Sequence, residues 1–180
     1  PLVVNSDFSF LALSSSKQIK EIPTSPSSVV IEPCVAISVV RWNPEVDRER
    51  KVAIYDLLEE NYFSPVAKLP GPYDLLLQIE DNRLVFRIKS IDQSGGQIRV
   101  LLPMSGLRQV IKDYFTVCES YHNAIKYSRP NQIEALDAGR RGLHDEGSQM
   151  LLEILKEKIA IDFNTARRLF TLICAVQLRS

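Results

Sequence analysis

The stretch Tyr73–Leu102, YDLLLQIEDNRLVFRIKSIDQSGGQIRVLL, decides the fold. Apolar and polar residues alternate along it in three runs, and the turn-forming residues Asp81-Asn82 and Ser94-Gly95-Gly96 separate these runs. A period of two places every second side chain on the same face of a strand. Because two-residue turns join antiparallel neighbours, the stretch predicts a three-stranded antiparallel meander with one apolar face.

The segments around the meander are predicted to be helical. Apolar residues recur at the spacing of a helix in four segments: from about 44 to the breakers at Ser64-Pro65, about 105–127, about 128–158, and from near Asp162 onward. Asn43-Pro44-Glu45 supplies a cap, a first-turn proline and an acid for the first of them. A β-branched run at Ala36–Trp42 predicts a further strand. The expected fold is therefore α+β: a small antiparallel sheet, the three-stranded meander plus an N-terminal strand, covered on one face by about four helices.

The composition of residues 1–35 differs from that of the rest of the chain. This segment holds eight serines and four prolines without a sustained period, and such a composition buries too little apolar surface to fold. We predict a disordered N-terminal extension over residues 1–35 and a single α+β domain over residues 36–180. The apolar pieces Phe8–Leu11 and Val29–Ile31 leave docking onto the domain as the alternative.

The overall composition excludes several classes of function. Lys+Arg and Asp+Glu both number 22, so no global field would concentrate nucleic acid or an anionic membrane. The widely spaced Cys34, Cys118 and Cys174 form no CxxC pair and indicate a reducing compartment. With His122 and His144 as the two histidines, a metal site is not expected. No apolar run approaches the ~18 residues of a membrane helix, so the sequence favours a cytoplasmic protein without membrane contact, metal or cofactor.

A glycine-rich segment interrupts the third helical pattern. The run Gly139–Gly147, GRRGLHDEG, has three glycines, each of which costs ~1 kcal/mol in a helix relative to alanine. Close approach of another helix, or a kink, would explain them. Alternatively, the backbone opens to a small anion beside Arg140, Arg141 and His144, which are therefore candidate binding residues. Arg140 falls on the apolar stripe, where an arginine needs a buried partner or an anion.

His144 also has charged neighbours at helical spacing. Asp137 and Asp145 each lie four residues from Arg141, the distance that favours ion pairs on a helix. Such a group could orient the imidazole as an acid or a base. A salt-bridged surface without catalytic meaning is the alternative.

The meander carries a local excess of positive charge. From Arg83 to Lys112 there are six basic residues and one acid, a net charge of +5. Strand alternation places four of them on the face away from the helices: Arg83, Arg87, Lys89 and Arg99. This face is a candidate surface for a protein partner, including a second copy of the chain. Ordinary solvation is the alternative, and the absence of a stacking-aromatic motif argues against nucleic acid.

Four strings of the sequence, taken in order, resemble a known family. They are Val52–Asn61 (VAIYDLLEEN), Lys112–Phe115 with Cys118–Tyr121 (KDYF and CESY), Gly139–His144 with Glu146–Ser148 (GRRGLH and EGS), and Asp162–Phe163 with Thr165–Cys174 (DF and TARRLFTLIC). The family is the uncharacterised bacterial protein family 0262, and the resemblance covers about Ile37 to the C-terminus. It implies a domain of the bacterial cytoplasm with no assigned activity.

The sequence motifs do not combine into a recognised catalytic mechanism. The 180 residues contain no evident nucleophile with its base, no metal-ligand set and no cofactor motif, so no catalytic residue is assigned. We therefore expect a non-enzymatic cytoplasmic module for protein interaction or regulation. The first alternative is an enzyme or small-anion binder that uses Arg140, Arg141 and His144. The second is a nucleic-acid-associated protein that uses the basic face of the sheet.

Overall fold

A computed structural model describes residues 29–30, 44–91 and 96–177. This part of the chain forms helices α1 (Pro44–Glu59), α2 (Ser105–Tyr127), α3 (Pro130–Leu155) and α4 (Phe163–Gln177). Its strands are β1 (Val29–Val30), β2 (Phe63–Pro65), β3 (Tyr73–Glu80), β4 (Arg83–Ser90), β5 (Gln97–Pro103) and β6 (Ile159–Ile161). The predicted strand Ala36–Trp42 lies outside the described residues. The α+β class is confirmed.

The central sheet contains the predicted meander. Strands β3, β4 and β5 are antiparallel neighbours, and the register pairs Leu77 with Phe86 and Phe86 with Val100. Asp81 and Asn82 both have positive φ, 46° and 62°, as the primed turns of two-residue hairpins require. Strand β1 adds to β3 in parallel, so that the order is β1-β3-β4-β5. The two residues of β1 belong to the segment for which an extension is predicted.

A second, two-stranded sheet differs from the sequence-based expectation. Strands β2 and β6 pair in antiparallel fashion, with Phe63 opposite Ile161. We expected the third helix to continue to about residue 158, but it ends at Leu155 and the chain turns through a bond from Lys158 N–H to Leu155 O of 2.7 Å. Three-residue strands are too short to show a period of two, which explains why both were missed.

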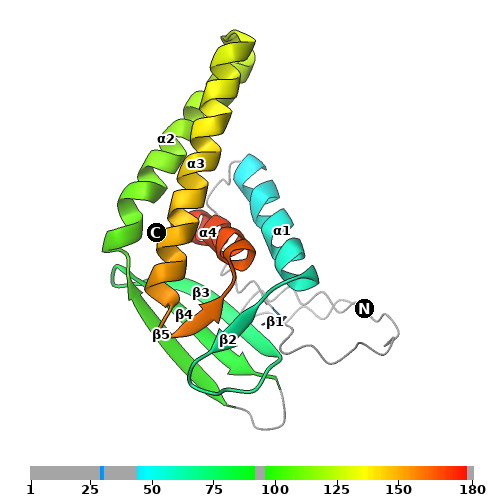
Figure 1. The fold of residues 1–180 in the computed structure, drawn as a ribbon, viewed down its shortest axis with the longest axis vertical. Coiled ribbons are helices and arrows are strands. Elements are labelled where there is room, and N and C mark those ends of the chain that lie inside the picture. The colour runs from blue at the N-terminus through cyan, green and yellow to red at the C-terminus, as the bar shows by residue number, and fades with distance from the viewer. Residues whose placement is uncertain (1–28, 31–43, 92–95, 178–180) are drawn as a thin grey trace, which may run out of the picture.

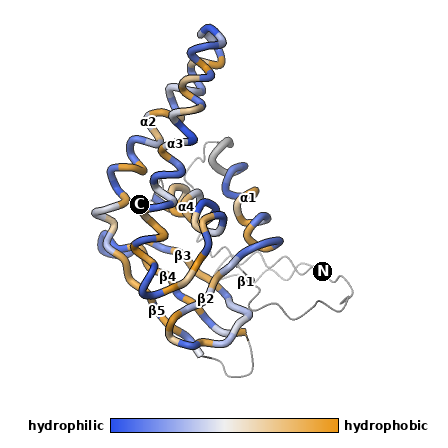
Figure 2. Tube along the Cα trace, in the orientation of Figure 1, coloured by the Kyte–Doolittle hydropathy of each residue, from blue (hydrophilic) through white to orange (hydrophobic). Residues whose placement is uncertain are grey.

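The helices lie on one side of the central sheet, and α2 with α3 forms a long hairpin whose far end projects beyond the other elements (Figure 1). Hydrophobic and hydrophilic residues alternate along the strands and along the helices (Figure 2). The apolar faces meet in one core, in which Phe86 of the sheet and Leu151 and Phe170 of the helices are all 0% exposed. None of the helices in residues 44–91 and 96–177 has an apolar stretch that would reach across a membrane.

The three glycines of α3 do not share one explanation. A Cβ on Gly147 would lie 2.2 Å from Cζ of Phe170, so this glycine allows α4 to approach α3. A Cβ on Gly139 would make an ordinary contact with Val117 at 3.8 Å, and one on Gly142 would meet nothing within 4 Å. Close helix approach, one of the predicted explanations, therefore accounts for Gly147 alone.

Alanine substitution should distinguish the tightly packed Gly147 from Gly142, which has open space around it. We expect Gly147→Ala to reduce the free energy of unfolding by about 1–3 kcal/mol, because the new methyl group overpacks against the Phe170 ring. The matched variant Gly142→Ala should be neutral or raise stability by up to ~1 kcal/mol through helix propensity. Urea unfolding of the two variants measures the difference. Equal stabilities would contradict the close approach.

Candidate functional site

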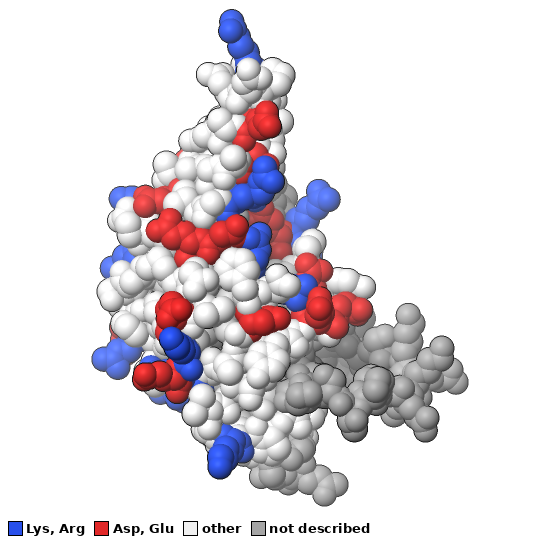
Figure 3. Space-filling model, in the orientation of Figure 1, with Lys and Arg blue, Asp and Glu red and all other residues white. Residues whose placement is uncertain are grey.

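A cleft of about 640 Å³ lies among the helices and receives residues from α1, α2, α3 and α4. We call it the arginine cleft because five arginines line it: Arg48, Arg140, Arg141, Arg167 and Arg168. Acidic and basic side chains are mixed on the surface around the place where α1, α3 and α4 meet (Figure 3). The volume falls in the range of small-molecule sites.

Helix α3 brings together the three residues that the sequence predicts as a group. Arg140, Arg141 and His144 all line the cleft. Asp137 holds both arginines, with one carboxylate oxygen 3.0 Å from Arg140 and the other 3.1 Å from Arg141. The predicted ion pair between Asp137 and Arg141 is therefore present. Asp145 instead forms its ion pair with Arg167 of α4.

Helix α4 supplies a second wall of the cleft, and none of its residues was among the predicted binding residues. Asn164, Arg167, Arg168 and Thr171 line the cleft, and their spacing of i, i+3, i+4 and i+7 places them on one helix face. Arg168 donates to the carbonyl oxygen of Glu60 and lies 3.6 Å from its carboxylate. The signal for this wall was in the sequence, as a polar stripe at helical spacing.

Helix α1 supplies the opposite wall with the same spacing. Glu49, Val52, Ala53 and Asp56 line the cleft and also follow i, i+3, i+4 and i+7. Carboxylates stand at the two ends of this stripe and apolar side chains in its middle. Arg48 precedes it by one residue. None of these residues was predicted as a binding residue, because the pattern of one helix cannot show which other helix it faces.

The guanidinium of Arg140 is half-buried and well provided with partners. Its plane lies over the ring of Tyr121, 5.5 Å from the centroid. Burial acts to lower the pKa of Arg140, but the hydrogen bond to Asp137 and the interaction with Tyr114 outweigh it and raise the pKa. Asp137 is therefore the partner expected for an arginine on an apolar stripe. The buried Nε–H donor of Arg140 is left without an acceptor among the described residues.

His144 is enclosed by aromatic rings and is 9% exposed. It makes edge contacts with Tyr114 and Phe170, with ring centroids 5.5 and 5.3 Å away. Its Nε2 lies 2.9 Å from the Thr171 hydroxyl, which donates to the Arg167 carbonyl at 3.3 Å. Nε2–H is therefore the donor to Thr171, and Nδ1 is left as a buried acceptor without a partner in the described part of the chain.

The electrostatics keep His144 uncharged at neutral pH. Burial, followed by the positive charges of Arg167 and Arg140, lowers the pKa of His144 to about 4. Burial likewise raises the pKa of Tyr114 and of the Cys174 thiol. These groups are neutral at pH 7, so the charge in the cleft comes from its arginines and carboxylates. Over residues 44–91 and 96–177, no group of His, Cys, Asp and Glu could hold a metal ion.

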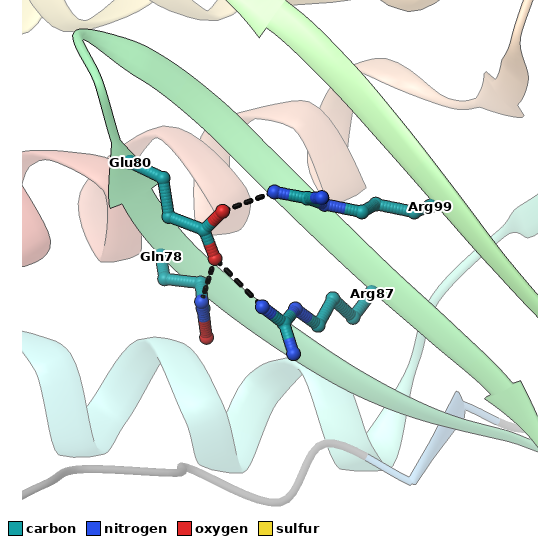
Figure 4. A network of polar contacts seen from close by, with 4 residues as sticks. All are labelled: Gln78, Glu80, Arg87 and Arg99. Carbon is teal, nitrogen blue, oxygen red and sulfur yellow. Dashed lines mark hydrogen bonds and ion pairs between the residues drawn. The ribbon is translucent and has the colours of Figure 1, made fainter.

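The basic residues predicted for the outer face of the sheet do share that face, but acids from β3 accompany them. Glu80 binds Arg87 at 2.7 Å and also pairs with Arg99 (Figure 4). Glu80 also accepts a hydrogen bond from the Gln78 side chain. The pKa of Glu80 is lowered, mainly by the hydrogen bond from Arg87.

The other two basic residues of this face also have acidic neighbours. Asp74 stands opposite Lys89 in the register, and Glu80 stands opposite Arg83. Burial raises the pKa of Asp74, and the charge of Lys89 partly offsets this. Four basic side chains and two carboxylates give the face a net charge of +2, below the +5 found along the chain from Arg83 to Lys112. The net charge of the face is lower because Asp74 and Glu80 precede that window, and because Arg108 and Lys112 lie in α2 and not on the sheet.

The low pKa of His144 predicts a dependence of stability on pH. Because the unfolded imidazole has a pKa near 6.5 and the folded one near 4, the unfolded state binds the extra proton between these values. Stability from this group is complete above pH 6.5 and falls as the pH drops through 6.5 to 4. Relative to His144→Gln, the wild type should lose about 2–3 kcal/mol of unfolding free energy over this window. A difference between the two proteins that stays constant in denaturant titrations at pH 7, 5.5 and 4 would contradict the assignment.

Comparison with known proteins identifies the family. The chain matches the model of an uncharacterised protein family, UPF0262, over residues 32–179. It is 54% identical over 140 residues to a UPF0262 protein of Paramagnetospirillum magneticum, covering 78% of this chain and 88% of the relative. It is 50% identical over 143 residues to one of Rhizobium meliloti, covering 79% and 89%. No solved structure matches the chain. As the four sequence strings indicated, the protein belongs to the UPF0262 family.

Proposed function

We propose that this domain is a non-enzymatic cytoplasmic binding module with a regulatory role, whose ligand is a small oxyanion held in the arginine cleft. One observation carries the proposal: five arginines from α1, α3 and α4 converge on a single cleft of about 640 Å³. Phosphate and carboxylate groups are the ligands that match guanidinium geometry. The binding of such an anion explains Arg140, Arg141 and His144 as one site.

The arginines retain donors for a ligand although acids hold four of them. The carboxylates of Asp137, Asp145 and Glu60 pair with these arginines without lining the cleft. A guanidinium has five N–H donors, and each of these ion pairs engages one nitrogen of its arginine. Five arginines and two carboxylates line the cleft, so its walls have a net charge of +3. The paired acids orient the arginines, and the remaining donors are available to an oxyanion.

The state of His144 favours binding over acid–base catalysis. A general acid or base works best with a pKa near the operating pH, whereas the pKa of His144 is lowered to about 4. Its Nε2 is occupied by Thr171 and its Nδ1 is buried. An enzyme that uses this segment is the alternative, and turnover of a bound ester would be its signature.

Removal of one arginine tests the proposal. Inorganic phosphate should raise the melting temperature of the wild type, because a ligand that binds the folded state stabilises it. In Arg140→Met the phosphate affinity should fall roughly 10- to 150-fold, since a charged hydrogen bond contributes ~1.5–3 kcal/mol. The matched control Arg83→Met removes an exposed arginine of the sheet and should bind as the wild type does.

Thermal melts and calorimetric titration with phosphate and citrate measure these effects. The anion site should be abandoned if neither anion shifts the wild-type melting temperature. It should also be abandoned if Arg140→Met and Arg83→Met lose affinity equally, because the effect would then reflect net charge alone. Higher salt should weaken specific binding only moderately, since the site is partly enclosed.

The outer face of the sheet supports a second candidate function, the binding of a protein partner or of a second copy. Leu76 and Leu101 are half-buried on this face and Val85, opposite Leu101, is buried, while Arg83 and Lys89 are exposed toward the two ends of β4. An apolar centre with a charged rim is typical of protein interfaces. Nucleic acid is less well supported, because Glu80 already pairs with Arg87 and Arg99.

Sedimentation tests this candidate for self-association. If the face joins two copies, the double variant Arg83→Glu/Lys89→Glu should shift the equilibrium toward the monomer, more strongly at low salt. Arg87 and Arg99 are less suitable targets, because Glu80 holds both and their reversal would disturb the sheet. A monomer at all concentrations would rule out the second copy. Unchanged recovery of protein partners by the double variant would rule out this face as their binding surface.

A further inference from the structure

We infer that the ligand of the arginine cleft is dipolar, with an oxyanion facing α3 and α4 and a protonated amine facing the carboxylate wall of α1. The inference rests on the proposed function and specifies the ligand class for the same site. Its basis is the polarity of the cleft: four arginines come from α3 and α4, whereas the two acids in the lining, Glu49 and Asp56, both come from α1.

The acids of α1 differ from the other acids around the cleft. Asp137, Asp145 and Glu60 are all engaged with arginines. By contrast, the carboxylates of Glu49 and Asp56 form no hydrogen bond or ion pair with any residue that the structure describes. If Glu49 and Asp56 served to neutralise the arginines of the cleft, they would form ion pairs with those arginines. Their carboxylates are instead available to a cation.

Asp56 is the better position for the amine. It lies in the last turn of α1, where the helix dipole adds partial negative charge and favours a cation. Glu49 has Arg48 as its neighbour in the sequence, which weakens the negative potential at that end. Along the helix the two acids are about 10 Å apart, since seven residues rise by 1.5 Å each. The amine is therefore assigned to the Asp56 end of the wall.

The middle of the same wall constrains the body of the ligand. Val52 and Ala53 lie between the two acids on the stripe that lines the cleft. Apolar surface there favours a hydrocarbon or ring between the charged groups. A plain oxyanion would satisfy the arginines but would face the α1 carboxylates, and facing like charges disfavour a ligand. The cleft thus selects for an amine in addition to an anion.

Matched probe pairs test the inference. Phosphoethanolamine and ethyl phosphate differ by one ammonium group, and γ-aminobutyrate and butyrate form the corresponding carboxylate pair. Calorimetric titration of the wild type should show about tenfold tighter binding of the amine-bearing member. In Asp56→Asn this preference should fall to about twofold or less, while the affinity for ethyl phosphate should stay equal or increase. Opposite effects on the two probes are not expected from a structural disturbance.

A control on the same helix accounts for net charge. Glu59→Gln removes one acid of α1 that does not line the cleft, and it should keep the tenfold preference. The inference is overturned if the wild type binds both members of each pair equally, or if Asp56→Asn retains the preference. If the wild type binds neither ethyl phosphate nor butyrate nor inorganic phosphate, the proposed function itself fails. A preference confined to one pair identifies the oxyanion as phosphate or as carboxylate.

Discussion

The contact between Gly147 and Phe170 is the constraint on which the rest of the site depends. Since a Cβ at residue 147 would lie 2.2 Å from the Phe170 ring, the missing side chain sets how closely α3 and α4 approach. Phe170 then packs at right angles to His144, with an interplanar angle of 86°. One turn further along each helix, the same approach brings Arg140 and Arg167 close enough to lower the pKa of His144. The packing of these two helices thereby brings together four of the five arginines that line the cleft.

The arginines of the cleft need counter-charges, and three acidic residues supply them to four of the five. Concentrated guanidinium groups repel one another, and half-buried ones also lose hydration. Asp137 supports two arginines from within α3, Asp145 links α3 to α4, and Glu60 links α4 to the end of α1. Each acid thus holds an arginine and, in two cases, fastens one helix to the next. The same ion pairs that make the arginines tolerable also position the walls of the cleft.

Features of the fold were predictable where the sequence pattern that specifies them is local and extends over many residues. The meander and the four helices were predictable because alternation and helical spacing are local and extend over many residues. Strands β2 and β6 were not, because three residues show no period and their pairing joins Phe63 to Ile161 across the chain.

Within the candidate site, Arg140, Arg141 and His144 were predicted as a group because they lie on one helix. The walls from α1 and α4 were not predicted, since spacing shows that residues share a face but not what that face meets. Glu80 was missed as the partner of Arg87 and Arg99 for the same reason.

The placement of α1 would couple binding of the proposed ligand to the stability of the fold. Its C-terminal end is held by a bond of 2.9 Å from Tyr62 N–H to the Thr165 hydroxyl and by the contacts of Arg168 with Glu60. These contacts fasten α1 to α4 at one end, while the stripe with Asp56 faces the cleft. A ligand that touches both walls adds a second connection between α1 and the α3–α4 pair. By linkage, it must then stabilise the docked position of α1 by as much as docking strengthens its own binding. Because the cleft is built from separate helices with walls of unequal charge, a ligand of the proposed class would therefore stabilise the packing of α1 against α4.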